Sequence, residues 1–136
     1  MASDKFTIRI YTPAGLILTA EATAVRLTAS DGEIGILPQH TRYVGLLGIG
    51  VLEYQSENGK ANRLVASNGF CNFVNDGLLI LADSVDLPEE VNSQTYDKER
   101  ASLQKLLQTA DSNADLDLTQ QKLRRIEAID QLLAVH

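Results

Sequence analysis

The chain has little of what disulfides, thiolate metal centres and membrane spans require. Its 136 residues include one cysteine, two histidines and no tryptophan. Cys71 cannot form an internal disulfide or a thiolate cluster, and we expect it to be a small buried hydrophobe in a reducing compartment. No apolar run approaches the roughly 20 residues of a spanning helix, and the first dozen residues hold no apolar signal-peptide core.

Positive charge is also scarce. Twelve Lys and Arg residues stand against eighteen Asp and Glu, which gives a net charge of −6. A protein that neutralises a run of phosphates needs the opposite balance, so the composition argues against nucleic acid as a partner. The hydrophobic fraction of 44%, with only three Phe and four Tyr, is nevertheless enough for an aliphatic core.

The first two thirds of the chain have the pattern of β-strands. Residues 5–11 alternate with period two and place Phe6, Ile8 and Ile10 on one face. Turn-forming Asn-Gly and Asp-Gly pairs follow at 57–60 and 75–77. Short strands with a turn about every eight to twelve residues are typical of a sandwich or barrel. We predict a β-sandwich of about ten strands over residues 1–88.

Beyond Pro88 the periodicity becomes helical. Residues 111–115 interrupt it, and we expect Asp117 or Thr119 to open a second helix. Two helices joined by a short polar loop pack as an antiparallel hairpin, here over residues 89–136. The fold class is therefore mainly β plus α. The apolar positions of the two helices are Tyr96, Leu103, Leu106, Leu107 and Ala110, then Leu123, Ile126, Ile129 and Leu133.

Residues for catalysis or metal binding do not come together in this pattern. The chain has no Gly-x-Ser-x-Gly elbow, no P-loop and no His-Glu-x-x-His segment. Glu33 and His40 are separated by an extended segment that places them about 20 Å apart. Nothing forces Asp31 to join them around a metal. We expect no catalytic residue, no metal site and no required cofactor.

Two sequence blocks carry a resemblance to a known family. Residues 31–40 read DGEIGILPQH, residues 66–70 read ASNGF, and residues 78–83 read LLILAD. In this order, and followed by a charged helical tail, they resemble the epsilon subunit of F-type ATP synthases. Such subunits carry a G-E-x-G-I-x-P-x-H segment, then an S-x-G-hydrophobic strand and a strand that ends in L-A-D. The resemblance runs from about Phe6 to the C-terminus.

The resemblance implies a non-catalytic rotor subunit of the central stalk that joins the gamma subunit to the c-ring of a proton- or sodium-translocating enzyme. It would lie on the cytoplasmic face of a bacterial plasma membrane, or its thylakoid or organelle equivalent, and reach the membrane only through the complex. The resemblance also implies that Gly32, Glu33, His40 and Arg42 would fall at the c-ring and gamma contacts. The family motif continues His-Ala-Pro-Leu-Leu, whereas residues 40–44 read HTRYV, which departs from it.

The start of the first helix resembles the apolar-D-x-x-R-A motif that binds ATP in some bacterial epsilon subunits. Asp97, Arg100 and Ala101 match it, with Tyr96 in the apolar position. The resemblance implies regulatory ATP as a ligand. From the residues alone, Asp97 and Arg100 form an ordinary i,i+3 pair on a helix surface.

The second helix supplies the basic residues for two further expectations. Arg124 and Arg125 would be the second-helix arginines of the ATP site. If the hairpin extends, Lys122, Arg124 and Arg125 would contact the alpha and beta subunits of the catalytic head and inhibit ATP hydrolysis.

An alternative from another class stays open. The chain could be a free-standing module in which the sandwich binds a small ligand or a peptide and the hairpin is a fixed buttress. Such a module would show a concave pocket with convergent polar groups. A stalk subunit would instead show an exposed apolar face.

Overall fold

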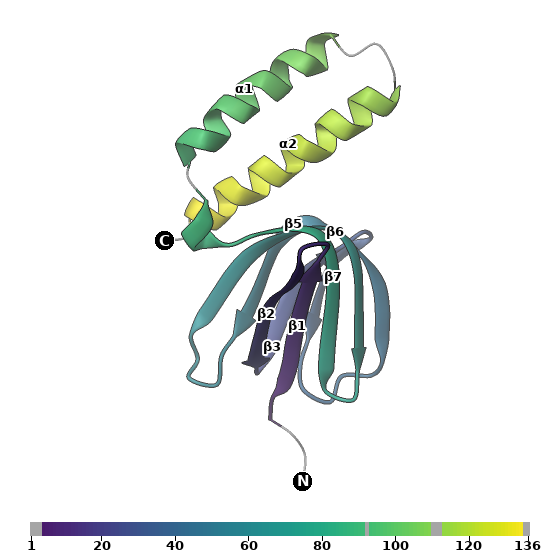
Figure 1. The fold of residues 1–136 in the computed structure, drawn as a ribbon. Helices are drawn as coiled ribbons and strands as arrows, with labels where there is room; N and C mark the ends of the chain where they lie inside the picture. The colour runs from purple at the N-terminus through teal and green to yellow at the C-terminus, as the bar shows by residue number, and fades with distance from the viewer. Residues whose placement is uncertain (1–3, 92, 110–112, 135–136) are drawn as a thin grey trace.

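The computed structural model describes residues 4–91, 93–109 and 113–134 (Figure 1). All strands in these ranges belong to one sheet, in the order β2-β1-β7-β6-β5-β3-β4. Neighbouring strands are antiparallel except β1 and β7. The strands are β1 (Phe6–Thr12), β2 (Gly15–Ala22), β3 (Ala24–Ala29), β4 (Gly32–Ile36), β5 (Tyr43–Gln55), β6 (Ala61–Val74) and β7 (Gly77–Asp86).

The helical part follows directly. A 3-10 turn, Pro88–Glu90, leads into α1 (Ser93–Thr109) and α2 (Asn113–Ala134). The domain boundary that we expected after residue 88 falls within this turn.

The strand number that we expected was wrong: the described ranges hold seven strands, not about ten. The coarse class, a β-sandwich with a C-terminal helical hairpin, is confirmed. The difference arises because β5 and β6, of 13 and 14 residues, curve through the whole fold instead of stopping at its corner (Figure 1). The β5–β6 ladder skips Gly48 and Asn68, and the β6–β7 ladder skips Asn68 and Asp83. Such irregularities bend a strand without ending it.

Gly69 makes this bend possible. Its φ is +143°, and that of Asn68 is +54°. A Cβ at position 69 would overlap the carbonyl oxygen of Leu81 and lie 2.9 Å from the Cα of Ala82. Only glycine combines this conformation with so close an approach of the next strand.

The core lies between the inner faces of the bent sheet. Phe6, Ile8 and Ile10 are buried together, as the alternation predicted. The ring of Phe6 meets that of Phe73 edge-on with centroids 5.5 Å apart. Cys71 is buried in the same core, and this burial raises the pKa of its thiol. The expectation of a buried, hydrophobe-like cysteine is therefore confirmed.

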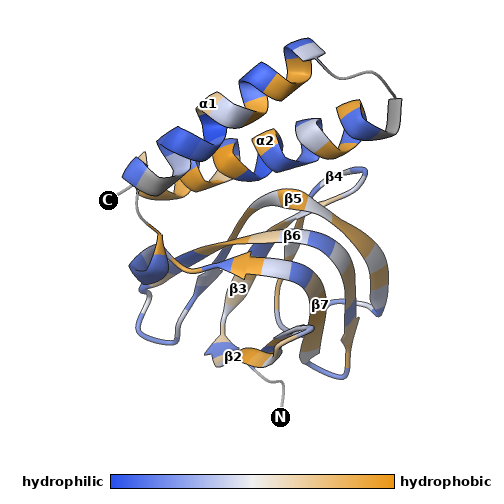
Figure 2. Ribbon diagram, turned by 45° about the horizontal axis from the view of Figure 1, so that its top comes forward, coloured by the Kyte–Doolittle hydropathy of each residue, from blue (hydrophilic) through white to orange (hydrophobic). Residues whose placement is uncertain are grey.

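The second helix packs on the outer face of β5 and β6, and α1 packs mainly on α2. Hydropathy colouring shows the apolar positions of α2 above apolar positions of the strands (Figure 2). The contact joins Val51 and Val65 of the sheet to Ala128, Ile129 and Leu132. The apolar stripe of α2 therefore packs against the sheet as well as along the seam between the helices.

The expected start of the second helix was too late in the chain. α2 begins at Asn113, so Asp117 and Thr119 lie inside it. The hydroxyl of Thr119 donates a hydrogen bond of 2.8 Å to the carbonyl of Asp115, one turn back. Asp115 lies in the first turn, where a carboxylate interacts favourably with the helix dipole.

We predict that Gly69→Ala destabilises the protein by at least about 3 kcal/mol, because it adds steric overlap to an unfavourable φ. Gly59→Ala is the matched control. Gly59 also has a positive φ, of +82°, but a Cβ there would meet no atom within 4 Å, so the cost should be about 1 kcal/mol. Urea unfolding measures the loss of stability in both variants. Equal losses would contradict a steric requirement for glycine at position 69.

Candidate functional site

A buried carboxylate joins the sheet to both helices. Asp86 ends β7, and its side chain is 8% exposed. Arg125 of α2 donates two hydrogen bonds to it, from Nε to Oδ2 at 2.9 Å and from Nη2 to Oδ1 at 2.6 Å. The hydroxyl of Tyr96 in α1 donates to Oδ1 at 3.5 Å. We call these three residues the hairpin joint.

The environment of the joint keeps its donors in place. The Arg125 guanidinium lies 5.6 Å from the centre of the Tyr96 ring, and its Nη1 is 3.9 Å from Glu99. Hydrogen bonding to Asp86 raises the pKa of Arg125, and burial raises the pKa of the Tyr96 hydroxyl. Arg125 therefore stays charged and Tyr96 protonated at neutral pH, the forms in which both donate.

The residues of the expected ATP site are already engaged with carboxylates or lie elsewhere. Arg100 donates to Asp97 at 2.9 Å and also to Asp130 on α2, so two carboxylates neutralise it. Ala101 is exposed, and Arg125 belongs to the hairpin joint. A nucleotide at this place would have to displace Asp97 and Asp130 from Arg100. ATP binding stays a prediction.

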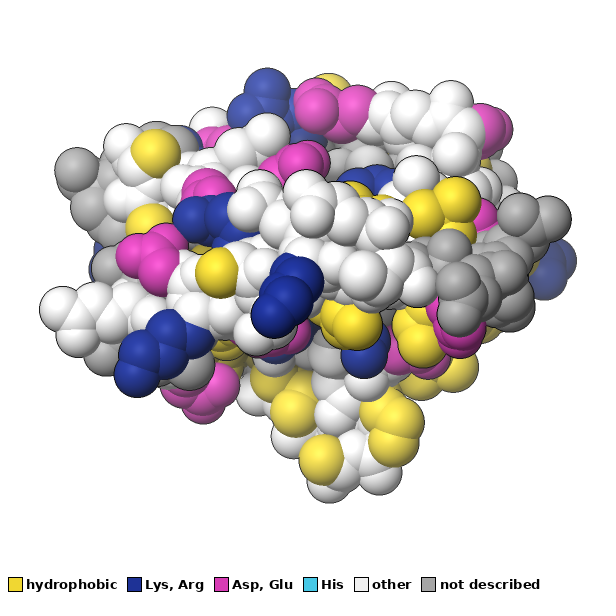
Figure 3. All heavy atoms as spheres, turned by 90° about the horizontal axis from the view of Figure 1, so that it is seen from above, with side chains coloured by type: hydrophobic (Ala, Val, Ile, Leu, Met, Phe, Trp, Pro, Cys, Tyr) yellow, Lys and Arg dark blue, Asp and Glu magenta, His cyan; other side chains and the backbone are white. Residues whose placement is uncertain are grey.

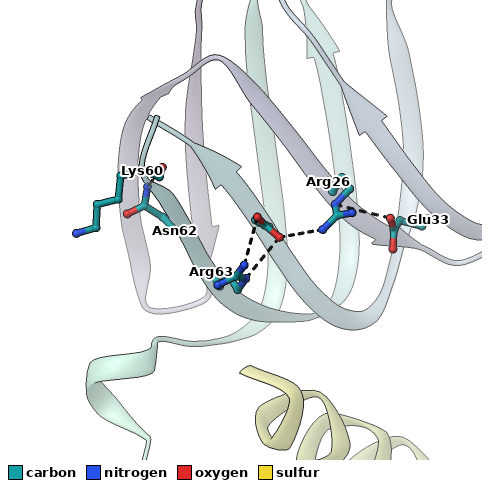
Figure 4. A network of polar contacts seen from close by, with 6 residues as sticks. Arg26, Glu33, Lys60, Asn62 and Arg63 are labelled. Atoms are coloured by element: carbon teal, nitrogen blue, oxygen red, sulfur yellow. Dashed lines mark hydrogen bonds and ion pairs between the residues drawn. The ribbon is translucent and has the colours of Figure 1, made fainter. Parts of the chain in front are cut away.

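The residues expected to contact the c-ring lie at the start of β4. Gly32 turns the chain with φ +135°, and Glu33 is 3.8 Å from Arg26. Arg26 in turn contacts Glu53 at 2.9 Å, and Arg63 contacts the same carboxylate at 3.4 Å. Alternating charges thus cross β4, β3, β5 and β6 (Figure 4).

His40 and Arg42 lie beyond the other end of β4, beside the β6–β7 turn. The backbone N–H of Gln39 donates to Asp76 of that turn at 2.8 Å. The His40 ring packs edge-on against Phe73, with centroids 5.9 Å apart. The four residues expected at the c-ring and gamma contacts therefore form two groups, one at each end of β4.

The three basic residues expected to inhibit hydrolysis have different surroundings along α2. Lys122 lines a hollow between the helices, with Leu106 and Leu118. Arg124 lines hollows between α2 and the sheet, and Arg125 is held by Asp86. From the helical side, basic and acidic side chains are interspersed (Figure 3).

An exposed apolar row, which we did not identify from the sequence, crosses five strands of the sheet. Its members are in direct register on β5, β6, β7, β1 and β2. The leucines of the row are 44 to 63% exposed. The sequence does contain one sign of this row, the unbroken apolar run at residues 78–81, because such a run places apolar side chains on both faces of a strand. The apolar row consists of Leu46, Phe70, Leu81, Tyr11 and Leu16.

Comparison with known proteins shows which family has this architecture. Residues 5–88 match the family model described as the β-sandwich domain of the ATP synthase delta/epsilon chain. An ATP synthase epsilon chain of Desulfitobacterium hafniense is 31% identical over 129 residues, 95% of each chain. The chain belongs to the ATP synthase epsilon family. Another epsilon chain, from Prochlorococcus marinus, is 29% identical and aligns over 92% of this chain and 95% of its own length.

Solved structures show that this epsilon-family chain shares its fold with chains of mitochondrial ATP synthases. One, in an assembly of OSCP, F1 and c-ring from Euglena gracilis, aligns with a TM-score of 0.85 at 22% identity. The alignment covers 100% of this chain and 84% of that chain. Another, in the central stalk and c-ring of the Tetrahymena thermophila enzyme, aligns with a TM-score of 0.68 at 12% identity. That alignment covers 98% of this chain and 99% of the other. No helix in the described part of the chain is long and apolar enough to cross a membrane.

The hairpin joint should show strong coupling in a double-mutant cycle of Asp86→Asn and Arg125→Gln. Removing either partner leaves a desolvated polar group, so each single change should weaken hairpin docking by about 2–4 kcal/mol, with a coupling of about 1.5–3 kcal/mol. Amide hydrogen exchange of residues 126–132 measures docking.

Arg26 and Glu33 provide the control pair for this cycle. Their side chains are 64% and 65% exposed, so their coupling should stay below about 0.5 kcal/mol. A coupling for Asp86 and Arg125 as small as that of the control pair would rule out the joint as the main polar attachment.

Proposed function

We propose that this epsilon-family chain is a non-catalytic rotor subunit in the central stalk of an F-type ATP synthase, where it joins the gamma subunit to the c-ring. The apolar row is the observation that carries this proposal beyond family membership. It lies on the part of β5 and β6 that α2 leaves uncovered. An exposed apolar face that spans five strands is typical of a surface that another protein covers.

The row has the energetic capacity for such a contact. Covering a leucine side chain fully contributes about 1.5–3 kcal/mol, and Leu16, Leu46 and Leu81 all retain much of their surface for a partner. The aromatic rings of Tyr11 and Phe70 alternate with them along the row. Aromatic side chains are enriched at the centres of protein interfaces.

The surface hollows do not favour the alternative of a ligand-binding module. One of about 470 Å³ is lined by Asp4, Lys5, Thr23 and Glu57. Small-molecule sites have mainly apolar walls with a few polar groups that converge. The described lining residues of this hollow are all polar or charged, which is not the lining typical of such a site.

The two ends of β4 suit contacts with two different subunits. In this proposal Gly32 and Glu33 face the polar loops of the c-ring, and His40 and Arg42 face gamma. Glu33 also lines a hollow with Arg124 and Glu127 of α2, so the c-ring contact would adjoin the docked hairpin. The chain would then be held at the membrane through the complex.

We further propose that the hairpin regulates ATP hydrolysis by leaving the sheet. Docking rests on a short apolar contact with Val51 and Val65 and on the hairpin joint. Much of that gain is offset by the entropy of ordering two helices. New contacts with the catalytic head could therefore compete for the hairpin. Release would free Arg125 from Asp86 and present it, with Lys122 and Arg124, to acidic surfaces of the alpha and beta subunits.

Leu46→Gln and Leu81→Gln should each weaken binding to the purified gamma subunit by about tenfold or more, because each removes apolar area from the proposed interface. Leu118→Gln is the matched control. Leu118 is 53% exposed, close to Leu46 and Leu81 in exposure, but it lies on α2. Surface plasmon resonance compares the three variants, and equal effects at all three positions would exclude the apolar row as the gamma contact.

The hairpin proposal predicts opposite effects of two changes in the reconstituted enzyme. Deleting residues 89–136 should raise ATP hydrolysis while synthesis persists, because the brake is absent. Asp86→Asn should lower hydrolysis, because it releases an intact hairpin from the sheet. Steady-state ATPase assays measure both. Hydrolysis that is unchanged by the deletion would make the hairpin a purely structural element.

A further inference from the structure

The second helix is held differently on its two flanks. Arg125 pairs with Asp86 on one flank. Arg124, the next residue, lies on the other flank, over β3 and β5. In the described parts of the chain no carboxylate lies within ion-pair distance of Arg124. The cation on this flank is exposed, and two carboxylates, those of Glu33 and Glu127, share a hollow with it without forming an ion pair.

A polar hollow lies beside this cation. It has a volume of about 290 Å³, and neither Asp nor Glu is among its described lining residues. Thr28 and Ser30 supply hydroxyls from the sheet side. Asn68 donates from Nδ2 to the Oε1 of Gln121 on α2 at 3.4 Å, which leaves the amide nitrogen of Gln121 as a donor. The hollow therefore presents donors from both the sheet and the helix.

Glycine keeps the floor of the hollow open. Gly48 lines it, and a Cβ there would lie 3.2 Å from the carbonyl oxygen of Ala29. The next glycine, Gly50, packs so closely on Thr28 that a side chain would collide with the Thr28 hydroxyl. β5 thus runs close beside its neighbour β3, and without side chains on these glycines the hollow over the two strands stays open.

We propose that this hollow binds a small oxyanion of the phosphate class, with Arg124 as its charged ligand. A guanidinium offers paired donors that match two oxygens of such an anion. Thr28, Ser30 and Gln121 complete the set with neutral donors. Glu33 and Glu127 line the adjacent hollow with Arg124, and their negative charge weakens the binding of an anion.

The bound anion would stabilise the docked hairpin. Arg124 and Gln121 belong to α2, whereas Thr28 lies in β3 and Ser30 in the turn that follows it, so the complete site exists only while the hairpin is docked. At ten times its dissociation constant, the anion would shift docking by about elevenfold. The proposed site requires only that the hairpin is docked. It does not depend on whether the chain is a rotor subunit.

The test is a titration of the isotope-labelled full chain with sodium phosphate, against sodium chloride at equal ionic strength. Nuclear magnetic resonance follows the Arg124 Nε–H and the side-chain amides of Asn68 and Gln121. Phosphate should give saturable shifts, and Arg124→Gln should abolish them. Lys122→Gln, which removes a cation from the interhelical hollow, should leave them intact. Glu33→Gln should tighten binding several-fold.

A second measurement separates this site from binding elsewhere. Phosphate should slow hydrogen exchange of the α2 amides in the unmodified chain and leave exchange unchanged in Arg124→Gln. Shifts that chloride reproduces, or that persist in Arg124→Gln, would overturn the proposal. Saturable binding without slower exchange in α2 would overturn it as well, because the anion would not then bridge helix and sheet.

Discussion

The fold depends on one sheet being able to turn back on itself without losing its hydrogen-bonded continuity. The ladder runs from β2 to β4 through every strand of the described chain. At the corner, Asn68 and Gly69 adopt positive φ, and the carbonyl of Leu81 occupies the space that a side chain would need. Both layers therefore share β5, β6 and β7. The same strands carry the helical contact in one half and the exposed apolar row in the other.

The attachment of the hairpin combines two kinds of interaction with different consequences. The apolar contact around Val65 supplies affinity and tolerates small shifts. The bidentate pair of Asp86 and Arg125 has strict geometry, and its desolvation cost offsets much of its attraction. The pair therefore contributes more to orientation than to stability. Tyr96 extends this orientation to α1, because it donates to the same carboxylate.

Local pattern predicted much of the fold. The alternation of Phe6, Ile8 and Ile10 gave the correct inner face, and the turn at residues 75–77 has the two positive φ values, at Asn75 and Asp76, that its sequence favours. The ordered motifs indicated the family correctly. The strand count failed because the inner face changes phase at the bend, from Leu64 and Ala66 to Cys71 and Phe73 in β6, and such a change reads as a break between two strands.

The candidate sites were less predictable, because they depend on which groups tertiary packing brings together. Nothing near Arg100 in the sequence indicates that Asp130 on the facing helix will neutralise it. Likewise, nothing in the sequence around Asp86 indicates that it is the buried partner of Arg125. Spacing along a helix defines neighbours on that helix only. The roles of Glu33, His40 and the basic residues of α2 stay predictions.

The packing order of the helices is the reverse of their order in the chain. α1 leaves the ribosome before α2, but its main contact is α2, and it is α2 that packs directly on the sheet. Until α2 is complete, α1 has no surface on which to bury Leu103. A chain that stops between the helices would expose an amphipathic segment to proteases and to aggregation. The two helices therefore form one folding unit, in which α1 depends on α2 to bury its apolar side chains.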